Sequence, residues 1–136
     1  MHREATNIKK GNLKLIIESQ KQQENVLVVL TQKRVEFYLV VQATKPIYKF
    51  HSYADLKNVK VKKVKDEPDM EQFSFRLAVN KWHRSEKLDG TFTEQKQDIL
   101  ILSQSSESKK ARREAQDWMT ALEYMRTKLV YELFAE

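Results

Sequence analysis

The 136-residue chain contains no cysteine, only two glycines and two prolines, and no long apolar run. Without cysteine it forms neither a disulfide framework nor a thiolate metal site. Gly11 and Gly90 stand too far apart for the glycine-rich loop that cradles phosphates in nucleotide-binding proteins. No apolar stretch approaches the length of about eighteen residues that a membrane-spanning helix needs. Residues 1–7 also lack the apolar centre of a secretion signal.

Positive charge is concentrated in the first half of the chain. The net charge is +6, but residues 1–65 hold fourteen Lys and Arg against five Asp and Glu, whereas residues 66–136 hold eleven against fourteen. This asymmetry indicates an anionic partner, such as lipid headgroups, nucleic acid or an acidic protein surface. A lysine-rich solvated surface would account for it equally well.

Signatures of catalysis are missing. His2, His51 and His83 are scattered without the spacing of metal ligands, and no serine lies in a nucleophile-elbow motif. Residues 37–38 and Tyr48 are not interleaved with basic residues as a stacking platform for nucleic acid would require. We therefore expect no enzymatic activity, no cofactor, no metal and no nucleic-acid partner.

Alternating apolar residues and runs of β-branched residues predict seven strands. They are placed at residues 11–17, 26–30, 35–41, 47–50, 59–64, 73–79 and 99–102. Turns are predicted between them at residues 32–33, 44–46 and 53–56. The dipeptide Asp89-Gly90 predicts that the segment from residue 80 to residue 96 protrudes as a hairpin.

A single amphipathic helix is predicted at the C-terminal end of the chain. Ser105, Ser106 and Ser108 are its candidate N-caps. No repeat or linker interrupts the sequence, so we expect one domain over residues 1–136 with a core at about residues 8–134. The apolar residues of the helix recur at steps of three and four and form one stripe: Ala111, Ala115, Trp118, Met119, Leu122, Met125, Leu129 and Leu133.

The order and spacing of these elements resemble the pleckstrin homology (PH) domain family. The resemblance implies a mainly β fold with one C-terminal α-helix, in which a seven-stranded barrel of two near-orthogonal antiparallel sheets is capped by the helix. The open end would carry three variable loops, here residues 19–24, 42–46 and 80–97. The matching residues are Gly11-x-Leu13, Val28-Val29-Leu30, Phe73-x-Phe75-x-Leu77, Ile99-Leu100-Ile101-Leu102 and Trp118-Met119-x-Ala121-Leu122.

The usual phosphoinositide-binding motif of the PH family is missing. In the family, a basic residue late in the first strand and a basic-x-Arg pattern early in the second donate charge-assisted hydrogen bonds to adjacent phosphates. The matching positions here are Leu15 and the segment Glu24-Asn25-Val26. The resemblance therefore argues against a deep, phosphate-selective pocket of the usual kind.

Candidate lipid-binding residues lie in and beside the three open-end loops. Each cation near an anionic bilayer contributes about 1 kcal/mol, and an indole suits the headgroup level of a membrane. The alternative is that Trp82 packs under a long hairpin while the charges are solvated. The candidates are Lys21, Lys45, Lys49, Lys81, Trp82, Arg84 and Lys87.

Two further basic segments have simpler explanations. Within residues 57–65, alternation places Lys60 and Lys62 opposite the neighbouring valines, which indicates the solvated face of a half-buried strand. A protein or lipid contact surface is the alternative. The predicted helix begins with cations that oppose its dipole, beside which an anion could bind: Lys109, Lys110, Arg112 and Arg113.

We therefore predict a non-catalytic PH-fold module that is cytoplasmic and peripheral on the cytoplasmic face of a membrane, with no transmembrane segment. Its partners would be acidic phospholipid headgroups, such as phosphatidic acid or phosphatidylserine, which contact the basic open-end loops. The alternative is a protein–protein interaction scaffold, or adaptor, that binds no lipid.

Overall fold

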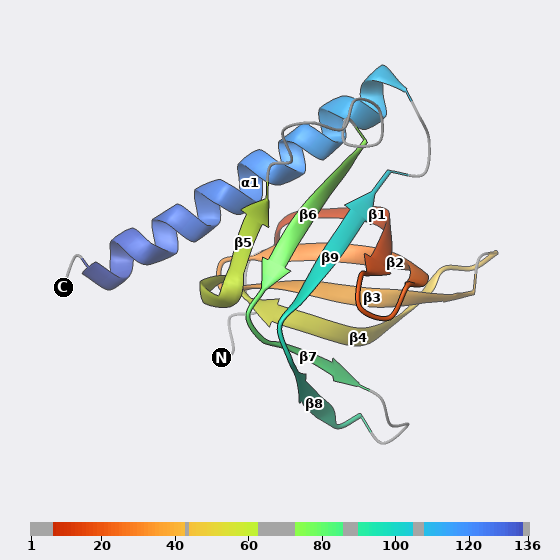
Figure 1. The fold of residues 1–136 in the computed structure, drawn as a ribbon. Helices are drawn as coiled ribbons and strands as arrows, with labels where there is room; N and C mark the ends of the chain where they lie inside the picture. Colours follow the sequence, from red (N-terminus) through yellow and green to blue (C-terminus); the bar gives the residue numbers. More distant parts are fainter. Residues whose placement is uncertain (1–6, 43, 63–72, 86–89, 105–107, 135–136) are drawn as a thin grey trace, which may run out of the picture.

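The computed structural model of the chain describes residues 7–42, 44–62, 73–85, 90–104 and 108–134. These residues are mostly β-sheet with one C-terminal helix, which confirms the predicted fold class (Figure 1). The elements are β1 (Asn7–Ile17), β2 (Gln22–Thr31), β3 (Arg34–Gln42), β4 (Ile47–Asp55), the 3-10 turn η1 (Leu56–Asn58), β5 (Val59–Lys62), β6 (Ser74–Val79), β7 (Trp82–Ser85), β8 (Phe92–Gln95), β9 (Asp98–Ser103) and α1 (Lys109–Phe134).

The strands form one open sheet and not a closed seven-stranded barrel. Nine strands are hydrogen-bonded in the order β5-β6-β9-β1-β2-β3-β4-β7-β8, and each neighbouring pair is antiparallel. In Figure 1, β5, β6 and β9 cross in front of β1–β4, so the sheet coils into two crossing layers. The sheet stays open because its edge strands, β5 and β8, do not pair with each other. The β7–β8 hairpin adds two strands to the seven that were predicted and pairs with β4 at one edge.

Strand β4 is longer than the sequence predicted. Residues 53–55 were expected in a turn, but they continue the strand, and Tyr53 lies opposite Glu36 of β3. The chain extends because Ala54 alternates inward and is buried, as is Leu56 in η1. The protruding hairpin predicted from Asp89-Gly90 is confirmed as β7–β8, with Gly90 at a φ of +79°; residues 86–89 lie outside the described residues.

Helix α1 covers the core with its apolar stripe. Trp118 is buried and stacks on Phe75 of β6, with ring centroids 6.3 Å apart. Gly11 of β1 lies beside the indole, since a Cβ at that position would be 3.4 Å from Trp118 Cζ2. The predicted cap at Ser108 is confirmed, since the Ala111 amide donates to Ser108 Oγ at 3.1 Å. The other two candidate caps, Ser105 and Ser106, lie outside the described residues.

Candidate membrane-contact site

The tip of the β3–β4 hairpin exposes apolar side chains beside lysines. Val41 is 61% exposed, Ile47 56% and Tyr48 39%, and these are three of the five large hydrophobic residues exposed in the described part of the chain. Lys45 and Lys49, two of the predicted lipid-binding residues, are exposed between and beside them. We call these five residues the hairpin tip.

The hairpin tip lies beyond the residues of β3 and β4 that pair with neighbouring strands. Strand β2 pairs with β3 only as far as Leu39, and β7 pairs with β4 only at Ser52 and Tyr53. Beyond these points β3 and β4 pair with each other, and the register shifts between Val40 and Gln42. In Figure 1 the hairpin extends past the adjacent strands. The outer part of the hairpin is therefore hydrogen-bonded only between its own two strands.

The composition of the hairpin tip suits the boundary of an anionic bilayer. Burying apolar surface is favourable by about 25 cal/mol per Å², so valine and isoleucine side chains gain by leaving water. Tyrosine is enriched at membrane interfaces, where its ring is apolar and its hydroxyl stays hydrated. Lysines carry a long apolar stem and reach phosphates with their ammonium groups. Large apolar side chains left exposed close together on one hairpin suggest an interaction site.

A shallow cavity of about 290 Å³ lies at the root of the hairpin tip, beside β1 and β2. Lys14 of β1 lies opposite Asn25 of β2, so an ammonium and an amide line the same depression. Lys14 was not among the predicted site residues. The lining residues are Asn12, Leu13, Lys14, Asn25, Val26, Val40, Pro46 and Tyr48.

Trp82 lies in the core and is not available to a membrane. It is 1% exposed, and its indole Nε1 donates a hydrogen bond to the Lys96 carbonyl at 3.1 Å. The prediction that Trp82 lies at headgroup level is therefore wrong. The alternative, in which Trp82 packs under the hairpin, agrees with its burial. The physical reason is the alternation of β7, which turns Trp82 and Arg84 inward.

Arg84 is likewise buried and already has an anionic partner. It is 5% exposed, and its Nη2 donates to Glu24 Oε1 at 2.9 Å. The other Glu24 oxygen lies 3.7 Å from His51 Nε2. Glu24 stands where the PH family's phosphoinositide motif would have a basic residue. Its carboxylate instead contacts side chains of β4 and β7 inside the protein.

The remaining predicted residues are distributed over three places. Lys21 is exposed in the β1–β2 turn at a φ of +52°, and Ser19 in the same turn donates to the Asp98 carboxylate. Lys81 is exposed and its Nζ lies 3.7 Å from Glu94 Oε1 on the neighbouring strand. Lys87 lies outside the described residues. The structure therefore brings Lys45 and Lys49 together with apolar residues, and it places Lys81 in a different hairpin.

An aromatic cluster fixes the base of the hairpin on the outer face of the sheet. Phe50 stacks on Tyr38 with centroids 5.0 Å apart and contacts Phe92 of β8 at 5.0 Å. The Tyr38 hydroxyl donates to Glu36 Oε1 at 3.0 Å. Burial, followed by the neighbouring Glu36 carboxylate, raises the pKa of Tyr38 to about 12. This packing holds β3, β4 and β8 together below the hairpin tip.

Comparison with known proteins identifies the fold. No protein-family model and no curated protein matches the sequence. The Slm1 PH domain in complex with inositol-4-phosphate is 13% identical, with a TM-score of 0.55 over 91% of this chain and 99% of that one. The ORP8 PH domain is 16% identical, with a TM-score of 0.57 over 88% and 97%. A DH/PH fragment of PDZRHOGEF in complex with human RhoA is 15% identical, with a TM-score of 0.55 over 91% and 29%.

The chain therefore has the fold of a PH domain, as its strand and helix motifs indicated. At these identities the likeness concerns the fold alone. Among the described residues, no helix combines the length and the apolar character needed to cross a bilayer.

Proposed function

We propose that this chain is a non-catalytic PH-fold module that binds acidic membrane surfaces through the hairpin tip. Val41, Ile47 and Tyr48 enter the boundary between headgroups and acyl chains, and the Lys45 and Lys49 ammonium groups contact lipid phosphates. The observation that carries the proposal is the gathering of exposed apolar side chains and lysines on one projecting hairpin.

The proposed ligand is an acidic phospholipid, either phosphatidic acid or phosphatidylserine. A lysine ammonium is a point charge and lacks the planar, two-pronged geometry with which arginine pairs with phosphate. Lysines on a projecting hairpin therefore select a lipid by the charge of its headgroup more than by its shape. The position that would clasp a phosphoinositide carries Glu24, and Arg84 is paired with it. Binding therefore depends on the anionic lipid fraction more than on the inositol ring.

Liposome co-sedimentation tests this function. We expect binding to vesicles that contain phosphatidic acid or phosphatidylserine, little binding to neutral phosphatidylcholine vesicles, and weaker binding as salt screens the charges. The double change Lys45→Glu and Lys49→Glu should abolish binding. A matched control, Lys33→Glu with Lys81→Glu, makes the same charge change away from the hairpin tip and should retain most of it. Equal loss in both variants, or no binding to any anionic vesicle, contradicts the proposal.

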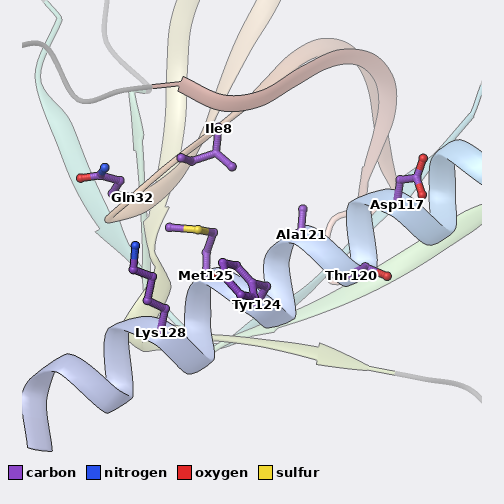
Figure 2. A pocket seen from close by; sticks show the side chains of 8 residues that line it. All are labelled: Ile8, Gln32, Asp117, Thr120, Ala121, Tyr124, Met125 and Lys128. Carbon is purple, nitrogen blue, oxygen red and sulfur yellow. The ribbon is translucent and has the colours of Figure 1, made fainter. Parts of the chain in front are cut away.

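A second function, protein interaction, is favoured by a groove beside α1. Figure 2 shows Tyr124 and Met125 of α1 pointing toward Ile8 of β1 across a cavity of about 420 Å³. Tyr124 and Ile8 are both exposed, although they are large and apolar. A scaffold that uses this groove would bind no vesicle in the panel above. The same sedimentation experiment therefore separates the two functions.

A further inference from the structure

A polar cavity lies at the opposite end of β4 from the hairpin tip. It has a volume of about 280 Å³ and opens where η1 and β5 meet the ends of β6 and β9 and one turn of α1. In Figure 1 this corner is at the left and the hairpin tip is at the right. The polar residues that line it include Lys57, Asn58, Lys60, Lys62, Asn80 and Arg126.

Two residues that line this cavity each carry a buried side-chain donor with no hydrogen-bond partner. Asn58 Nδ2 and Arg126 Nε are two of the five buried side-chain atoms left unpaired in the described part of the chain, and both residues line the cavity. The backbone carbonyl of Asn58 accepts the backbone amide of Asn80 at 3.0 Å, which fixes the position of Asn58 beside the end of β6. Unpaired buried donors are rare in folded proteins and often mark the place of a water or ion. Since both groups can only donate here, the missing partner is an acceptor.

The charge of the cavity points to an anion as that acceptor. Lys57, Lys60 and Lys62 are exposed at its rim, and neither they nor Arg126 form an ion pair with another described residue. Asp98 is the acidic residue in the lining, and its oxygens already accept hydrogen bonds from Ser19 and from the Ile99 amide. The four cations outnumber this carboxylate, so the net charge of the lining is positive.

We propose that this cavity binds a phosphate monoester dianion. Three acceptor oxygens would pair with the Arg126 guanidinium and the Asn58 amide inside and with the lysine ammonium groups at the rim, as charge-assisted hydrogen bonds. The guanidinium supplies directional donors, which the hairpin tip lacks. The same group is present in soluble sugar phosphates and in the headgroup of phosphatidic acid. The site lies away from the hairpin tip, so it does not depend on the proposed membrane function.

Nuclear magnetic resonance of the isotope-labelled full chain tests the site at the two donors themselves. Glucose 6-phosphate at millimolar concentration should shift the Asn58 side-chain amide and the Arg126 Nε–H signals, and glucose should not. Short-chain phosphatidic acid below its micelle concentration forms a second arm. Shifts with either phosphate compound support the site, and the compound that causes them shows whether a soluble sugar phosphate or a lipid headgroup is bound. An equal response to chloride, or no response in either arm, overturns it.

Variants separate binding from folding. Arg126→Met should weaken phosphate affinity about tenfold or more, and Lys33→Gln, an exposed charge elsewhere, should change it less than about twofold. Because Arg126 Nε has no partner to lose, the thermal midpoint of Arg126→Met should not fall. Unchanged affinity in Arg126→Met overturns the proposal. If that variant unfolds, Asn58→Ala with intact thermal stability gives the same test, and unchanged affinity there also overturns it.

Discussion

The β3–β4 and β7–β8 hairpins have similar residues and opposite environments. Both combine basic residues with large apolar ones, and both were expected to face an anionic membrane. In the first, Ile47 and Tyr48 are exposed and Lys45 is solvated. In the second, Trp82 and Arg84 are buried. Residue type alone therefore does not define a membrane-contact surface in this chain.

The difference comes from what lies beside each hairpin. Strand β7 pairs with β4, which places its inward side chains over the core, where Arg84 meets Glu24. The outer parts of β3 and β4 extend beyond the residues that pair with β2 and β7, and there they are hydrogen-bonded only to each other. One hairpin thus stabilises the fold, and the other presents a surface at little cost to stability. Each prediction below tests one side of this comparison.

Truncation at the buried hairpin should have the largest effect. Trp82→Ala removes a fully buried indole and its hydrogen bond to the Lys96 carbonyl, and should lower the free energy of unfolding by about 3–5 kcal/mol. Ile47→Ala in the hairpin tip should lower it by less than about 0.5 kcal/mol. Urea denaturation of both variants measures the contrast. Similar values for the two would show that the hairpins do not differ in their contribution to stability.

Breaking the buried ion pair comes next. Arg84→Met leaves the Glu24 carboxylate buried without its main partner and should cost about 3 kcal/mol of stability. The paired change Arg84→Met with Glu24→Met should recover a large part of that loss, because it removes both charges. A double-mutant cycle by urea denaturation gives the coupling. Additive losses would mean that the two side chains do not stabilise each other.

Removing apolar surface from the hairpin tip should weaken membrane binding without unfolding the protein. Val41→Ser together with Ile47→Ser should reduce affinity for vesicles containing phosphatidic acid by about tenfold. This loss should persist at high salt, whereas the effect of Lys45→Glu and Lys49→Glu should shrink there. Co-sedimentation across a salt series measures both. If the serine variant binds as tightly as the parent, electrostatics alone accounts for the contact.

The smallest effect is expected at Lys81. Its ion pair with Glu94 is exposed on both sides, so Lys81→Gln should change stability by less than about 0.5 kcal/mol and vesicle affinity by less than about twofold. Thermal unfolding and co-sedimentation check the two values. A large loss of vesicle binding would extend the contact surface to the β7–β8 hairpin.

The strands and the helix were predictable from local sequence patterns, whereas the exposure of the candidate site residues depends on pairing between distant strands. The alternation of Leu13, Leu15 and Ile17 and the helical stripe around Trp118 depend on neighbours in sequence, so both were predictable. The inward turn of Trp82 depends on the pairing of β7 with β4, which no local pattern encodes. The exposure of Ile47 depends on where β2 and β7 stop pairing with β3 and β4. The apolar residues that begin at Ile47 correctly predicted a strand. They gave no sign that this end of the strand is exposed.

The depth of the hairpin tip in a bilayer can be measured directly because the chain has no cysteine of its own. An environment-sensitive fluorophore on the Ile47→Cys variant should brighten and shift to the blue with phosphatidic acid vesicles, and a quencher carried on the acyl chains should reach it. The same label on the Glu94→Cys variant, in the other hairpin, should stay in water. Binding of both proteins without a change at position 47, or with equal changes at both positions, would contradict membrane contact through the hairpin tip.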